Sequence, residues 1–152
     1  MSPRAAWRLE DLGFTRVYDY AAGKADWGSF GLPLEGEADS STRVGGVTRA
    51  DAPRCLPDEI VSAVAERVGD EWQICVVTNA EGVVLGLLGR EALRSAERHR
   101  AKDVMSLGPS TIRPSGRRDA IAQRMRDQEL TRIVVTHPDG VLVGVLRRED
   151  LA

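Results

Sequence analysis

Few side chains in this chain of 152 residues have the type and spacing for catalysis or metal binding. His99 ends a basic stretch and His137 lies in an expected hairpin turn, so they form no ligand set with the two cysteines. Cys55 and Cys75 lie in apolar, strand-like sequence, which favours buried, reduced thiols. The serines lack the glycine-flanked turn of an activated nucleophile. We therefore expect a protein that is not an enzyme and holds no metal or cofactor.

Binding of an anion is the chemistry that the charge distribution favours. Residues 1–93 carry 9 basic and 15 acidic side chains, whereas residues 94–152 carry 12 basic and 8 acidic ones, so the net charge of −2 combines −6 with +4. A solvated helix face is the alternative explanation. Nucleic acid is an unlikely partner, because the basic stretch at 94–102 has no interleaved aromatic residues. With no long apolar run and no signal peptide, we expect a cytoplasmic protein without membrane contact.

The elements that would position such a ligand occur twice in the sequence. Residues 78–93 return as residues 136–151, and the spacing between equivalent positions is constant along the whole match. Each copy reads as strand, helix, strand, strand and helix, with a helix opening at Leu56-Pro57 in the first and a hairpin turn at Asp139-Gly140 in the second. The sequence therefore predicts an α/β (α+β) fold in which two βαββα units pack with pseudo-two-fold symmetry.

Periodicity within the copies predicts which side chains form the core. The positions expected to be buried are Ile60, Val64, Val68, Val76, Leu85, Leu87, Ile121, Met125, Val134, Val143 and Val145.

An additional arm precedes the repeats. Residues 7–12 read as a short helix ended by Gly13, residues 14–20 as a strand and residues 21–27 as a second helix. The predicted division is residues 1–36 for this helix-strand-helix arm, 37–46 for a poorly ordered or extended linker and 47–152 for the paired repeats.

The second copy resembles a cystathionine-beta-synthase (CBS) domain. The segments that carry the likeness are Asp103–Ser106, Pro109–Pro114, Arg132–Val135, Asp139-Gly140, Leu142–Val145 and Glu149–Leu151. Two such domains in tandem form a Bateman module, so the resemblance covers residues 47–152. It implies a disc-like, often dimeric pair with two clefts, which commonly bind adenosine nucleotides or related adenosyl ligands and regulate an attached or partner protein.

The resemblance also implies which residues bind the ligand. Family members place a Ser or Thr for phosphate three residues before an Asp for the ribose; here Arg147 and Asp150 occupy these positions in the second copy, and Gly89 and Ala92 in the first. The cleft served by Arg147 and Asp150 is thus expected to bind the ligand, and the cleft served by Gly89 and Ala92 is expected to stay empty. An Asp150 that merely pairs with Arg147 or caps the last helix is the alternative. The proposed ligand residues are Thr111, Ile112, Arg132, Arg147 and Asp150.

The arm resembles the last strand and helix of a rhodanese domain over Leu12–Tyr20, Gly23–Trp27 and Gly31–Pro33. It has no cysteine of its own, so this C-terminal rhodanese-like fragment lacks the residue that carries sulfur in that family, and sulfur transfer is not expected. Its large aromatic side chains are expected to pack on the repeats or on a second copy of the chain. They are Trp7, Phe14, Tyr18, Trp27 and Phe30.

Two functions follow from these observations. The first is a regulatory sensor module that binds AMP, ADP, ATP, S-adenosylmethionine or a related adenosyl ligand between the repeats. The alternative is a dimerisation or protein-interaction module that keeps the fold without a ligand. Both are compatible with a homodimer and with an unidentified regulated protein.

Overall fold

The computed structural model describes residues 2–18, 20, 23, 27, 28, 30, 32, 42–95 and 98–151. Within these ranges no helix is both long and apolar enough to cross a lipid bilayer.

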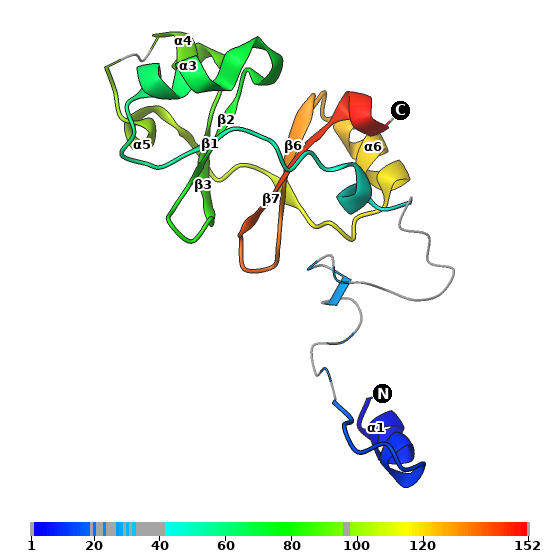
Figure 1. Ribbon diagram of the computed structural model, residues 1–152. Helices are drawn as coiled ribbons and strands as arrows, with labels where there is room; N and C mark the ends of the chain where they lie inside the picture. Colours follow the sequence, from blue (N-terminus) through cyan, green and yellow to red (C-terminus); the bar gives the residue numbers. More distant parts are fainter. Residues whose placement is uncertain are drawn as a thin grey trace.

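The two units have the same order of elements (Figure 1). The first contains β1 (Arg54–Cys55), α3 (Val61–Trp72), β2 (Cys75–Thr78), β3 (Val84–Leu88) and α4 (Arg90–Ser95). The second contains β5 (Thr111–Ile112), α6 (Arg118–Asp127), β6 (Arg132–Thr136), β7 (Leu142–Arg147) and a 3-10 turn, η3 (Arg148–Leu151), in place of the expected last helix. The remaining elements are α1 (Ser2–Asp11), the 3-10 turn η2 (Val44–Val47), α5 (Ala101–Val104) and β4 (Ser106–Leu107).

Each unit forms its own sheet. The strand order is β1-β2-β3-β4 in the first and β5-β6-β7 in the second. In both, the first short strand pairs in parallel with the second, and a β-bulge interrupts the following hairpin at equivalent places, Val77/Thr78 and Val135/Thr136. The predicted fold class is therefore confirmed.

A local two-fold axis relates the units at their hairpin turns. Val84 N–H donates to the carbonyl of Gly140 at 3.0 Å, and Leu142 N–H donates to the carbonyl of Gly82 at 2.9 Å. Replacing each residue by its equivalent in the other copy converts one of these bonds into the other. Because equivalent groups exchange roles, the repeats meet symmetrically, as predicted.

The segment before each sheet packs on the opposite unit. Arg49 and Val145 exchange two backbone hydrogen bonds, of 2.9 and 3.0 Å, which attach the chain after η2 to β7. In the same manner β4, which follows α5, pairs with β3. Two segments cross between the units, residues 44–53 before β1 and residues 105–110 before β5. Figure 1 shows these crossing segments, cyan and yellow-green, running in opposite directions. Each unit is therefore completed by residues that precede the other one.

This exchange corrects the predicted linker at residues 37–46. Residues 44–46 lie in the 3-10 turn η2 rather than in an extended chain, and Val44 is fully buried in the second core with Met125 and Leu146. Residues 33–41 lie outside the described residues.

Most of the predicted core is buried, with one error. Val64, Val68, Val76, Met125, Val134 and Val145 are buried, and Leu85, Leu87, Ile121 and Val143 are half-buried. Ile60, however, is 41 % exposed. The reason is that α3 begins at Val61 and not at Leu56-Pro57, so Ile60 precedes the helix and forms an isolated bridge with Arg100.

The arm agrees with the prediction only at its start. The helix α1 ends at Asp11, before Gly13, whose φ of +93° is the left-handed conformation that favours glycine. No strand forms over residues 14–18 or at residue 20, and most of the second expected helix lies outside the described residues. Trp7 is 63 % and Tyr18 87 % exposed, whereas the Phe30 ring stacks on His137 with centroids 5.4 Å apart.

Candidate functional site

The inner face of the second sheet carries the residues that meet the first unit. In an antiparallel pair, residues directly opposite each other point to the same face. Arg132 pairs with Arg147 and Val134 with Val145, so these four side chains share one face of β6 and β7. Two arginines therefore stand side by side at one end of this face.

An open hollow of about 370 Å³ lies on this face, between the two units. Ile74 and Leu87 contribute from the first unit, and the second unit supplies the rest. Those residues are Pro109, Ser110, Glu129, Leu130, Thr131, Arg132, Ile133, Val134 and Val145. The hollow thus combines apolar walls with two hydroxyl groups, one guanidinium and the carboxylate of Glu129.

Arg132 is the unsatisfied group of this hollow. Its Nε atom is buried and has no hydrogen-bond partner among the described residues. A buried donor without a partner costs about 1–3 kcal/mol, and more when the group is charged. The hollow therefore offers a ready position for an acceptor, and most favourably for an anion.

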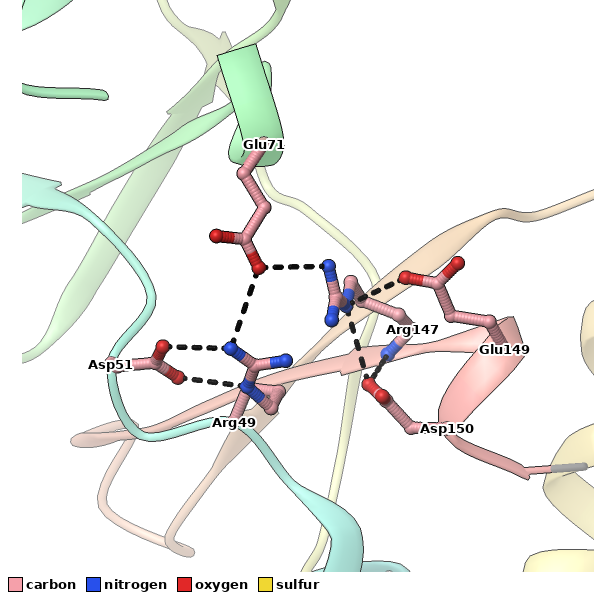
Figure 2. A network of polar contacts seen from close by, with 6 residues as sticks. All are labelled: Arg49, Asp51, Glu71, Arg147, Glu149 and Asp150. Carbon is pink, nitrogen blue, oxygen red and sulfur yellow. Dashed lines mark hydrogen bonds and ion pairs between the residues drawn. The ribbon is translucent and has the colours of Figure 1, made fainter. Parts of the chain in front are cut away.

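The region around Arg147 is filled by the protein's own side chains instead (Figure 2). Arg147 lies 3.4 Å from Glu71 Oε1 through Nη1, and its Nε lies 3.0 Å from Glu149 Oε1 and 3.4 Å from Asp150 Oδ2. Because Glu71 belongs to α3 of the first unit, this network joins the two repeats.

Arg49 extends the network from the crossing segment before β1. It donates two hydrogen bonds to Asp51, of 3.0 and 2.9 Å, and Nη2 lies 3.5 Å from the same Glu71 oxygen. The hydrogen bonds from Arg49 hold the pKa of the Asp51 carboxyl below its ordinary value. Glu71 is therefore shared by two guanidinium groups.

Trp72 packs beneath these two arginines. The guanidinium carbons of Arg49 and Arg147 lie 5.5 and 5.4 Å from the centroid of its ring, within the range of cation–π attraction. Trp72 is 6 % exposed and the Arg147 side chain 12 %. The aromatic ring, two arginines and four carboxylates form one cluster between the two units. Glu71 and Trp72 are the counterparts of Glu129 and Leu130, which line the open hollow, so the place of this cluster is called the second cleft.

The five residues predicted to bind one ligand do not line one cavity, although Arg132 and Arg147 lie directly opposite each other on β6 and β7. Arg147 and Asp150 are in contact, and Asp150 also accepts a hydrogen bond from the backbone N–H of Arg147 at 3.3 Å, which is the pairing named above as the alternative. Arg132 lines the open hollow instead. Thr111 is exposed, and the Ile112 side chain is buried in the second core.

The reason for the difference is the short parallel strand β5. Its residues pair with Val134 and Val135, so the positions that reach the hollow are the two before it, Pro109 and Ser110. Sequence reasoning missed Ser110 and Thr131, and it missed Glu71 and Trp72 altogether. Alignment of the two copies could have pointed to Trp72. The second copy has Leu130 at the equivalent position, so the repeats differ there by a large aromatic side chain.

The two cysteines are buried as expected, Cys55 to 3 % and Cys75 to 1 % exposure, and both are free thiols. A hydrogen bond with Cys55, together with burial, raises the pKa of the Cys75 thiol. The Cys75 thiol is therefore a poor nucleophile.

Comparison with known proteins agrees with this architecture. Residues 101–152 match the family model of the CBS domain. No curated protein matches the chain significantly.

Several solved structures share the fold. The cytosolic domain of the magnesium channel MgtE in complex with ATP has a TM-score of 0.67 at 20 % identity, over 73 % of this chain and 48 % of that one. CBSX2 in complex with AMP has a TM-score of 0.64 at 18 % identity, over 72 % and 92 %. The CBS domains of a transcriptional regulator from Streptococcus pneumoniae have a TM-score of 0.62 at 20 % identity, over 72 % and 95 %. The chain thus spans about half of the MgtE domain and most of the other two. Its fold is that of two CBS repeats.

Proposed function

We propose that this protein is a non-catalytic regulatory module that binds an adenosine nucleotide or a related adenosyl ligand between its CBS repeats. The observation that carries the proposal is Arg132, a half-buried arginine on the wall of an open, mainly apolar hollow. Its Nε atom is buried and has no hydrogen-bond partner among the described residues. A nucleotide has the two matching parts, an aromatic base and an anionic phosphate.

The size and lining of the hollow support this class of ligand. Its volume of about 370 Å³ lies in the ordinary range for small-molecule sites. Ile74, Leu87 and Val145 form apolar surfaces on which a base can pack, while Ser110 and Thr131 offer hydroxyl groups. The structures of similar fold that contain ATP or AMP support the same class.

The proposal places the first ligand at Arg132 rather than at Asp150. Asp150 already accepts two hydrogen bonds from Arg147, and Trp72 occupies the space beside them. A ribose would have to displace these contacts before Asp150 could accept its hydroxyl groups. The open hollow requires no such displacement.

Binding is tested by thermal shift and calorimetry with AMP, ADP, ATP and S-adenosylmethionine. A ligand present at 100 times its dissociation constant adds about 2.7 kcal/mol to the free energy of unfolding. We expect Arg132→Ala to weaken the first binding event about tenfold or more, because it removes a charged hydrogen-bond donor. Arg126→Ala, on the exposed face of α6, is the matched control and should bind as the wild type does.

The outcome that contradicts the proposal is equally clear. If no adenosyl ligand produces heat or a thermal shift, the chain is the ligand-free interaction module described above.

We also propose that the module acts as a homodimer and regulates a second protein. The large apolar side chains of the arm support this assembly, because Trp7 and Phe14 are 63 % and 59 % exposed in the single chain. Multi-angle light scattering should give twice the chain mass of 16.6 kDa. A mass of one chain at all micromolar concentrations would rule the dimer out.

A further inference from the structure

The second cleft contains a segment of the protein that resembles a bound nucleotide in its chemistry. Trp72 places an aromatic ring against the guanidinium groups of Arg49 and Arg147, and Glu71 places one carboxylate oxygen 3.5 and 3.4 Å from the same two groups. An aromatic ring followed by an anionic group is also what a nucleoside phosphate presents. The neighbouring residues Glu71 and Trp72 therefore occupy this cleft as an internal ligand.

These two residues lie on a short segment that is bounded by changes in backbone direction. Gly69, inside α3, has φ 63° and ψ 177°, which interrupts the helix, and Gln73 ends it in the left-handed region at φ 53°. A Cβ atom at Gly69 would meet no described atom within 4 Å, so no neighbouring side chain packs against that side of the residue. Rotation at these two positions moves Glu71 and Trp72 together, and it withdraws the Trp72 ring from the first core, to which the ring belongs with Val64 and Val68.

The open hollow shows the corresponding position of the second copy, which has no tryptophan. At the constant spacing of the repeat, Leu130 stands in the second copy where Trp72 stands in the first. The counterpart of Arg147 is Gly89, which offers no side chain. The counterpart of Glu71 is Glu129, which lines the open hollow, so the carboxylate is present in both copies. The two clefts therefore differ in the tryptophan and in the arginine that it packs against.

We propose that Glu71 and Trp72 form a displaceable plug, and that a nucleoside phosphate opens the second cleft by replacing them on Arg49 and Arg147. This inference rests on the proposed function, because it uses the same class of ligand. Displacement turns the end of α3 outward and leaves the hydrogen bonds from Arg147 as the contacts that a ribose must still replace on Asp150. The first ligand molecule binds at Arg132. A second molecule binds in the second cleft only at a higher ligand concentration.

The plug lowers the apparent affinity of the second cleft by the fraction of molecules in which it is open. The second equivalent of nucleotide therefore binds about tenfold or more weakly than it does to a cleft without the plug. The first equivalent is unaffected, because its hollow contains neither Glu71 nor Trp72.

Trp72 reports the opening directly in a chain that carries Trp7→Phe and Trp27→Phe, since the sequence has 3 tryptophans. ATP is titrated into this protein by calorimetry, and Trp72 emission and acrylamide quenching are followed in parallel. We expect the first equivalent to leave the emission unchanged. The second should shift the emission to longer wavelength and increase quenching as the ring leaves its buried position.

Two variants test the plug itself by calorimetry in the otherwise unchanged chain. Trp72→Leu copies the residue of the open cleft and should tighten the second binding event about tenfold, with the first unchanged. Glu71→Gln removes the shared carboxylate while keeping the ring, so it tests the proposal even if Trp72→Leu does not fold. Glu66→Gln, exposed on the same helix, is the control and should bind as the wild type does.

The results separate failure of the plug from failure of the proposed function. A single equivalent that depends on Arg132, with no second event in the wild type, Trp72→Leu or Glu71→Gln, overturns the plug alone. Two binding events with unchanged Trp72 emission overturn it as well. The absence of any binding overturns the proposed function and, with it, this inference.

Discussion

Replacing Gly144 with alanine should break the attachment between the crossing segment and β7. A Cβ atom on Gly144 would overlap the carbonyl oxygen of Arg49 and lie 2.9 Å from Thr48 Cγ2. The obstacle is mainly backbone, so the segment must move away from the strand. This movement lengthens the two hydrogen bonds between Arg49 and Val145, which contribute about 1 kcal/mol each. The strain of overpacking adds about 1–3 kcal/mol.

We therefore expect Gly144→Ala to lower the free energy of unfolding by about 2–4 kcal/mol. For a chain of this size, that corresponds to a melting temperature lower by about 4–16 °C. Urea denaturation followed by circular dichroism measures the first quantity and calorimetry the second. Gly89→Ala is the control, because its new Cβ would meet no described atom within 4 Å, and we expect it to cost less than about 1 kcal/mol. Equal stability of the two variants would refute the packing of the crossing segment on β7.

Three further outcomes follow from the structure. Val44→Ala should destabilise the protein by about 2 kcal/mol in urea denaturation, because Val44 is fully buried in the second core; a cost near zero would contradict that placement. Asp58→Asn should lower the melting temperature at neutral pH, since ion pairs with two basic side chains hold the pKa of Asp58 below its ordinary value of 3.8. A lowered carboxyl pKa stabilises the fold above that ordinary value, so the difference from the wild type should shrink as the pH falls through the lowered pKa; a difference independent of pH would contradict the ion pairs. Cys55 and Cys75 should react with a thiol reagent only after denaturation, and rapid labelling of the native protein would contradict their burial.

The pairing of the repeats was predictable because it depends on local patterns. The apolar runs of the hairpins and the turn at Asp139-Gly140 predict β6 and β7. Because the repeat has a constant spacing, the equivalent residues of the first copy are expected to form the matching hairpin, β2 and β3. The crossing segment was not predictable in this way. Val44 and Val47 are its only long apolar side chains, and their burial depends on a surface that forms much later in the chain, around Met125 and Leu146.

The site was predictable only in part, for a similar reason. Arg147 and Asp150 are three residues apart, and their contact could be expected from that spacing. The roles of Arg49, Glu71 and Trp72 depend on long-range packing, which brings three distant segments to one place and cannot be read from spacing. The rhodanese-like origin of the arm, the homodimer and the cytoplasmic location stay predictions.

A crystal structure of the protein with AMP would show which side chains hold the nucleotide. We expect AMP in the hollow between Leu87 and Ser110, with its phosphate on Arg132 and with Trp72 still packed against Arg49 when one AMP is bound per chain. An empty hollow in crystals that contain AMP elsewhere on the chain, or AMP in the hollow with Arg132 turned away from its phosphate, would show that Arg132 does not form the phosphate site.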